Sequence, residues 1–311
     1  MITFSYTDKG GKGMNLVTYK FEEKKLIYMT DYGEKQSIVI VFMPYGPNNI
    51  FSLAQVFLID QMDKIDEEVL NNNVPIIQPY TDWIGPYKIN ALNNVDIPTD
   101  GHQFSGGCHA SATGEPTAES IYVDVFINNS IVTKDITNIS LTSPLIIVTT
   151  NMIEASNTHI NHKRYVLEEK VTYSVFNAKV NVELENQFKE SCLWIWYSGL
   201  QLSGQYYNQS EIKNSAVFGF QDFGRGVSSG PISKFGLADK VTLRNKENRD
   251  YLEAKLTKAK YKKVNLDVDD IVNGGAEPYY KFYYTLVNTA FEIGAGEIFS
   301  WEGSYTFYKE M

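Results

Sequence analysis

Apolar and polar residues alternate along much of this chain, and this period of two is the feature that most limits its fold. Successive side chains of a β-strand point to opposite faces, so the alternation predicts strands with one buried face. Near the end of the chain, strands are expected at 280–287 and 298–307. The clearest apolar stripes are Ile121, Val123, Val125 and Ile127; Val171, Tyr173 and Val175; Val180, Val182 and Leu184; and Leu193, Ile195 and Tyr197.

The pattern predicts an all-β protein with a large antiparallel β-sandwich of two sheets. Turns are expected at Asn128-Asn129 and at 176–179, because asparagine tolerates turn conformations. One helix is expected at 63–71, capped by Asp63. No internal repeat is present, which argues against a β-propeller. We expect a small, mostly β segment at 1–75 and a large sandwich domain at 76–311.

Composition narrows the classes of function. The 311 residues are 43% hydrophobic, enough for a full core, and the formal net charge is -9. An acidic chain repels phosphate backbones, so nucleic acid is not an expected partner. The two cysteines, Cys108 and Cys192, lack the paired spacing of a zinc site, and their spacing does not show whether they form a disulfide.

Several chemistries and locations are excluded by missing signals. No run of apolar residues is long enough for a membrane helix, and the start of the chain does not resemble a signal peptide. The chain has no nucleotide-binding P-loop and no serine-hydrolase elbow. The run at 224–226 lacks the context of a dinucleotide site. We therefore expect no cofactor, no metal and no membrane partner.

A loop-rich stretch at 80–119 is the strongest candidate for a ligand site. Long irregular loops in compact domains are uncommon unless they are functional. The Gly106-Gly107 pair allows the backbone to approach a ligand closely, and His109 follows directly. His109 is either a partner or general base for a sugar hydroxyl, or a histidine that packs within the loop. The ligand-binding candidates of this stretch are Asp82, Trp83, Tyr87 and Asn94.

Two later segments add candidates. Arg164 follows His159 and His162, and it would either neutralise an anionic ligand or pair with Glu168 or Glu169 on the surface. The two histidines lie in an expected loop, which disfavours a shared metal.

The second of the two later segments contains Trp194 and Trp196. Trp194 and Trp196 are two apart and so share one face of an expected strand. They would form either a platform on which sugar rings stack or part of the core between two sheets.

Three short segments carry a resemblance: 82–87 (DWIGPY), 104–109 (FSGGCH) and 113–117 (TGEPT). In this order they resemble uncharacterised proteins encoded in phages and prophages of Gram-positive bacteria. The run from 165–173 through 197–201 looks like their continuation and is similar to the supersandwich of galactose-mutarotase-like proteins and some polysaccharide lyases. The resemblance covers roughly residues 80–201. It implies a tail-associated virion protein that meets cell-wall or capsular glycan.

The resemblance also implies candidate pairs for catalysis. In mutarotase-like enzymes a histidine and an acidic residue act on the sugar ring. The matching pairs here would be His109 with Glu115, or His162 with Glu168.

Three functions fit these observations. The first is a carbohydrate-recognising protein of a phage particle, a homo-oligomer located in the virion, whose partners are cell-surface polysaccharide and other virion proteins. The second is a glycan lyase or hydrolase, with His109 as base, Glu115 beside it and Arg164 on a substrate anion. The third is a purely structural virion protein whose aromatic residues make subunit contacts.

Overall fold

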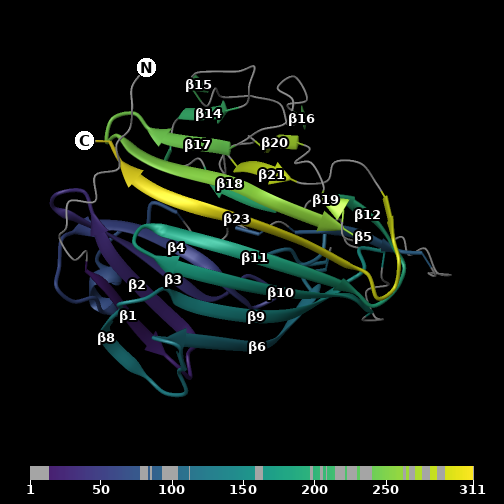
Figure 1. The fold of residues 1–311 in the computed structure, drawn as a ribbon, viewed down its shortest axis with the longest axis horizontal. Coiled ribbons are helices and arrows are strands. Elements are labelled where there is room, and N and C mark those ends of the chain that lie inside the picture. The colour runs from purple at the N-terminus through teal and green to yellow at the C-terminus, as the bar shows by residue number, and fades with distance from the viewer. Residues whose placement is uncertain are drawn as a thin grey trace.

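A computed structural model describes residues 14–77, 83–84, 86–92, 104–111, 113–157, 164–196, 199–203, 206–207, 209–213, 221–222, 230–231, 240–261, 264–265, 270–274, 281–285 and 291–310. These residues form antiparallel sheets with one short helix, which confirms the all-β class. Figure 1 shows the long strands of the largest sheet running side by side across the molecule. No helix within the described ranges is long and apolar enough to cross a lipid bilayer.

The first sheet has five strands in the order β4-β3-β2-β1-β8. Four of them follow one another as hairpins, while β8 joins from much further along the chain. The strands are β1 (Asn15–Lys20), β2 (Lys25–Tyr32), β3 (Gln36–Tyr45), β4 (Ile50–Asp60) and β8 (Ile136–Ser140).

The only helix of the described residues is α1 (Glu67–Asn71), which is shorter than expected. Asp66, not Asp63, caps it: the Asp66 Oδ1 atom accepts a hydrogen bond from the Val69 amide at 3.0 Å. Leu70 packs with Ile27, Met29 and other apolar side chains on one face of the five-stranded sheet. The helix therefore covers the face of this sheet that points away from the main core.

The second sheet has eleven strands, with the central order β18-β23-β11-β10-β9-β6. Along β11, buried Val180, Val182 and Leu184 alternate with exposed polar residues, as the sequence predicts. One face of the sheet thus lies in the core. The strands are β6 (Ala118–Ile127), β7 (Ser130–Ile131), β9 (Leu145–Glu154), β10 (Tyr165–Phe176), β11 (Lys179–Phe188), β14 (Gln209–Lys213), β15 (Gln221–Asp222), β17 (Lys240–Asn245), β18 (Asp250–Tyr261), β19 (Val264–Asn265) and β23 (Ile298–Lys309).

Two hairpin turns of this sheet have the predicted chemistry. Asn128 and Asn129 have φ of 48° and 64° between β6 and β7, the left-handed conformation that asparagine tolerates. Asn177 has φ of 51° between β10 and β11, where Phe176 pairs with Lys179. These turns fix the register, and the register decides which side chains of β10 and β11 point inward.

Two smaller sheets complete the described fold. The first has the order β22-β12-β5, with β5 (Lys88–Ala91), β12 (Cys192–Trp196) and β22 (Phe291–Ile293). The second has the order β13-β21-β20-β16, with β13 (Gly199–Ser203), β16 (Gly230–Pro231), β20 (Asp270–Gly274) and β21 (Lys281–Thr285). The expected strand at 280–287 corresponds to β21 and the one at 298–307 to β23.

One apolar core crosses the boundary that the sequence suggested near residue 75. Phe42 of β3 contacts Tyr173 of β10, with ring centroids 5.2 Å apart. Val17, Tyr28 and Phe42 belong to the same buried cluster as Trp194 and residues of β23. Strand β8 lies beyond residue 75 yet completes the first sheet. One face of the five-stranded sheet therefore packs into the shared core of the sandwich, while its other face packs with α1 in a second apolar cluster.

Candidate functional site

Polar side chains interrupt the apolar inner face of the large sheet at one level. Asn151 of β9 lies opposite Glu169 of β10, and Glu169 lies opposite Asn186 of β11. All three are buried. Elsewhere β10 and β11 present apolar residues to the core, for example Val171 and Leu184. Burying polar groups in such a layer costs free energy unless they are hydrogen-bonded, so this row stands out as a candidate site.

Glu169 is the ionisable centre of the row and is only 6% exposed. The Tyr87 hydroxyl donates a hydrogen bond to its Oε2 atom, and the Asn151 Nδ2 atom donates to its Oε1 atom at 2.8 Å. Burial raises the pKa of Glu169, while these two hydrogen bonds oppose the rise. Its carboxyl group is therefore held in place by two donors in an environment that favours the protonated form.

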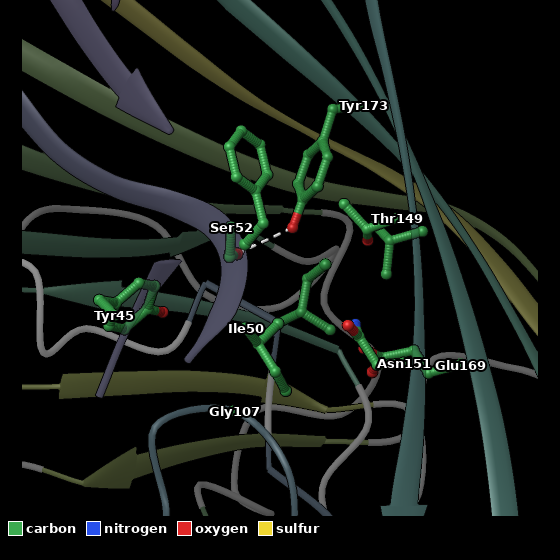
Figure 2. Close-up of a pocket in the computed structure, with 11 residues that line it drawn as sticks. Tyr45, Ile50, Ser52, Gly107, Thr149, Asn151, Glu169 and Tyr173 are labelled. Atoms are coloured by element: carbon green, nitrogen blue, oxygen red, sulfur yellow. Dashed lines mark hydrogen bonds between the residues drawn. The ribbon is translucent and has the colours of Figure 1, made fainter. Parts of the chain in front are cut away.

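A cavity opens beside this carboxyl group, between the two large sheets. Figure 2 shows Thr149, Asn151 and Glu169 on one side and the end of the β3–β4 hairpin on the other. Its empty space, counted out to the mouth, is about 350 Å³, but the atoms leave room for roughly one water molecule. The lining residues are Tyr45, Ile50, Phe51, Ser52, Ile84, Gly107, Thr149, Asn151, Glu169, Val171 and Tyr173.

Two buried polar atoms of the cavity wall have no hydrogen-bond partner among the described residues. They are the Oδ1 atom of Asn151 and the Oγ1 atom of Thr149. By contrast, the hydroxyl groups of Ser52 and Tyr173 bind each other at 2.9 Å. A buried acceptor that is left unpaired costs about 1–3 kcal/mol, so these two atoms favour a polar group inside the cavity.

The glycine loop forms the opposite wall, and backbone hydrogen bonds hold it there. Tyr87 and Ser105 exchange two backbone hydrogen bonds of 2.8 Å. Gly106 and Gly107 follow with φ of 77° and 54°. A Cβ atom on Gly106 would lie 3.2 Å from Ile153 and 3.3 Å from Tyr87, so the loop approaches the sheet as closely as only glycine permits.

Asn48, in the turn between β3 and β4, ties this loop to the start of β6. Its Nδ2 atom donates to the carbonyl oxygens of Gly107 at 2.8 Å and His109 at 2.9 Å. Its Oδ1 atom accepts from the amides of Thr117 at 2.7 Å and Ala118 at 3.2 Å. The side chain is 4% exposed, so its bonds lie away from solvent. Asn48 thereby sets the position of Gly107 in the cavity wall.

Three of the predicted aromatic ligand contacts lie in the core instead. Trp83 and Trp194 are 0% exposed, and so is Tyr87. The Trp83 ring packs on Tyr305 at 4.8 Å, and the Trp194 ring on Phe299 at 5.0 Å. A ring covered on all sides offers no face to a sugar, so none of these three rings stacks on a ligand in this arrangement. For Trp194 the structure shows burial in the core, the alternative to the platform that the sequence left open.

The histidine and glutamate proposed for catalysis do not line the cavity. The ring of half-buried His109 packs edge-on against Phe104 with centroids 5.4 Å apart. Glu115 is exposed, and its backbone amide donates to the Ser111 hydroxyl at 2.9 Å. The structure thus places His109 in a loop-packing role beside the wall that Gly107 provides.

Arg164 is paired with a residue that the sequence did not suggest. Its Nε atom donates to Glu190 Oε1 at 2.9 Å, and its Nη2 atom donates to the Oε2 atom of the same carboxylate. The pair raises the pKa of Arg164 and lowers that of Glu190. The expected partners differ: Glu168 pairs with Lys189 at 2.6 Å, and Glu169 is the buried carboxyl of the cavity. Arg164 is therefore engaged by an internal carboxylate.

Other predicted residues lie outside the described part of the chain. These are Asp82, Asn94, His159 and His162, together with the side chain of Trp196, whose backbone belongs to β12. Cys108 and Cys192 are both free thiols. Within the described ranges, no group of three or more histidine, cysteine, aspartate or glutamate residues is arranged to hold a metal ion.

The residues that form the cavity were missed in the sequence, although one signal pointed to some of them. Glu169 has the same parity as Val171, Tyr173 and Val175, the buried stripe of that strand. Asn186 likewise continues the stripe of Val180, Val182 and Leu184. A polar residue in register with a buried stripe indicates a buried polar site. No comparable local signal marks Asn48 or Tyr45, which lie at a turn and depend on contacts distant in sequence.

Glu169→Gln is expected to change how stability depends on pH. The folded-state pKa of Glu169 lies above the ordinary 4.5, so the wild type loses stability as pH rises from 4.5 through the raised value. Glutamine does not titrate. The free energy of unfolding of the variant relative to the wild type should therefore increase from pH 4 to pH 8, by about 1.4 kcal/mol per pKa unit of the shift.

Urea denaturation of both proteins across this range measures the difference. A difference that stays constant with pH, or that decreases, would show that Glu169 does not carry a raised pKa in the folded protein.

Comparison with known proteins identifies no family. No protein-family model matches the chain, and no curated protein matches it. Among solved structures, it is similar to the Slr1438 protein of Synechocystis sp. PCC 6803, with 10% sequence identity, a TM-score of 0.38 and coverage of 100% of each chain. A likeness at this level carries no argument about function, which has to come from the site.

Proposed function

We propose that this protein recognises carbohydrate, and that a hydroxyl-bearing end of a glycan binds in the cavity beside Glu169. The observation that carries the proposal is the pair of unpartnered, buried polar atoms in the cavity wall, Asn151 Oδ1 and Thr149 Oγ1. A sugar hydroxyl both donates and accepts hydrogen bonds, so it suits both of them.

The size of the cavity supports a hydroxyl as the group that enters. The floor has room for roughly one water molecule, and a hydroxyl oxygen occupies a similar volume. A ligand group that reproduces the hydrogen bonds of a displaced water loses little enthalpy. Half-buried Tyr45 adds an aromatic ring to the lining, the type of side chain that packs well against the apolar face of a sugar.

The setting that we propose for this activity is a phage particle that engages host cell-surface glycan. The support for this setting is the resemblance of segments 82–87, 104–109 and 113–117 to phage and prophage proteins. In the structure, two of these segments meet the site: Gly107 lines the cavity, and Tyr87 binds Glu169. Other virion proteins and further copies of this chain would be its partners in the particle.

Thr149→Val tests the proposal with little risk to the fold. Valine keeps the shape of threonine but removes the hydroxyl group, whose Oγ1 atom has no partner among the described residues. We expect a roughly two- to tenfold loss of affinity for cell-wall or capsular polysaccharide, since one hydrogen bond contributes about 0.5–1.5 kcal/mol. Binding is measured by pull-down and titration calorimetry with the purified protein.

Thr150→Val is the matched control. Thr150 is also buried and its hydroxyl is also unpartnered among the described residues, but it does not line the cavity. Successive strand residues point to opposite faces, so this variant should bind like the wild type. Equal losses in both variants, or no binding of any glycan by the wild type, would overturn the proposal. A large oligomer without glycan binding would favour the structural alternative, and released fragments would favour the enzyme.

A further inference from the structure

We propose that the cavity selects the uncharged, hydroxyl-bearing end of a glycan and rejects carboxylate-bearing and phosphate-bearing sugars. This inference rests on the proposed function, because it names the class of glycan that the same cavity accepts. It follows from three properties of the cavity wall: its charge, the polarity of its open hydrogen-bonding atoms and its size.

The charge of the wall is unsuited to an anion. Glu169 is the one acidic side chain among the described lining residues, and these residues include no lysine, arginine or histidine. The Tyr87 hydroxyl and the Asn151 Nδ2 atom already donate hydrogen bonds to the two oxygen atoms of Glu169, so these two donors are not available to an anionic ligand. A carboxylate or phosphate beside it would either be repelled or force the proton to remain on Glu169.

Two cations of the described residues, which could otherwise hold an anionic ligand, are already paired with carboxylates. Arg164, the candidate for holding an anionic ligand, makes two hydrogen bonds to Glu190. Lys189, which follows β11 directly in the sequence, pairs with Glu168 at 2.6 Å. The formal net charge of -9 repels anionic glycans at long range as well. The second function suggested by the sequence, a lyase with Arg164 on a uronate, finds no support in these contacts.

The two unpartnered atoms of the cavity wall favour a ligand group that can donate a hydrogen bond. Asn151 Oδ1 is only an acceptor, while Thr149 Oγ1 is a donor and an acceptor. An ionised carboxylate or phosphate presents only acceptors and would leave Asn151 Oδ1 unpaired. A hydroxyl group donates to Asn151 and accepts from Thr149. A buried polar atom left unpaired is costly, and sites built to pair with a hydroxyl discriminate strongly against groups that cannot do so.

The small size of the cavity also disfavours a carboxylate or a phosphate. The floor holds roughly one water molecule, whereas a carboxylate adds a second oxygen and a phosphate adds three. Ile50 and Val171 close the remaining wall with apolar atoms that offer such oxygens no hydrogen bonds. Accommodating an anion would therefore require movement of the β3–β4 hairpin or the Gly107 loop, which Asn48 holds in place.

Calorimetric titration with matched oligosaccharides tests the inference. Each pair has the same linkage and differs at one carbon: glucose against glucuronic acid, and galactose against galacturonic acid. We expect the wild type to bind one of the neutral members at least tenfold more tightly than its acidic counterpart. Equal or tighter binding of the acidic members would overturn the selectivity while leaving carbohydrate recognition intact. Binding of none of the four would remove both the proposed function and this inference.

Glu169→Gln separates charge from size. Glutamine has the same shape and its amide group can still bond Tyr87 and Asn151, but it carries no charge. We expect the preference for the neutral member to fall at least threefold in this variant at pH 8. Far-ultraviolet circular dichroism and the unfolding midpoint establish that it is folded. An unchanged preference in the folded variant would overturn the electrostatic part, and the wild-type comparison decides the selectivity without it.

Discussion

Trp194→Ala is expected to lower the free energy of unfolding by about 3–5 kcal/mol, the usual cost of removing a large buried aromatic side chain. Trp194 is 0% exposed and packs β12 of the three-stranded sheet against β11 and β23 of the large sheet. Its ring contacts Tyr87 at 5.4 Å, Phe188 at 5.3 Å and Phe299 at 5.0 Å. Alanine would leave a cavity among rings that belong to the large sheet and to the segment under the glycine loop.

Chemical denaturation followed by circular dichroism measures this effect. Trp194→Phe is the matched control, because it keeps an aromatic ring and should cost well under half as much. A loss below about 1 kcal/mol for Trp194→Ala would contradict its position in the core. The distinction matters for function: a lower amount of glycan bound by Trp194→Ala would reflect unfolded protein, so this variant is unsuitable as a test of ligand stacking.

The fold was largely readable from the sequence because its strands repeat a strong local pattern. The stripe from Val180 to Leu184 and the turn at Asn177 predicted both the strand and its buried face. The helix was less well predicted, since both Asp63 and Asp66 are good caps and tertiary packing of Leu70 decides between them. The boundary near residue 75 stays a prediction, and the change in element type on which it rests does not reveal that β8 returns to pair with β1.

The candidate site was harder to predict from the sequence than the fold, for a physical reason. Tryptophan pairs on a strand look the same whether they face solvent or a second sheet, and only the packing of Phe299 on Trp194 distinguishes the two. Parity with a buried stripe did mark Glu169, but its partner Tyr87 lies 82 positions away in the sequence. Contacts of that range depend on the arrangement of whole sheets, which local patterns do not contain.

Asn48→Ala is expected to destabilise the protein by about 2–4 kcal/mol, because it leaves several buried backbone groups without partners. The carbonyl oxygens of Gly107 and His109 lose a donor, and the amides of Thr117 and Ala118 lose an acceptor. A second tie remains, in which the Thr117 hydroxyl donates to the His109 carbonyl oxygen at 2.6 Å. The loop should therefore loosen without being released completely.

Two measurements separate a local effect from a global one. Hydrogen exchange should accelerate first at the Thr117 and Ala118 amides, while the centre of β10 keeps its protection until global unfolding. Asn181→Ala, at an exposed position on β11, is the control and should change stability by less than about 0.5 kcal/mol. Equal effects of the two substitutions would contradict the role of Asn48 as the clamp of the loop.

The consequence for ligand binding follows from the same contacts. Gly107 lines the cavity, and its position depends on the Asn48 side chain. If the cavity binds a glycan end, Asn48→Ala should weaken binding even at temperatures where the variant is fully folded, because a mobile wall must be ordered when the ligand binds. The preference for neutral sugars should fall as well, since a looser wall admits the larger carboxylate group. Glycan affinity that is unchanged in the folded variant would place the ligand elsewhere on the molecule.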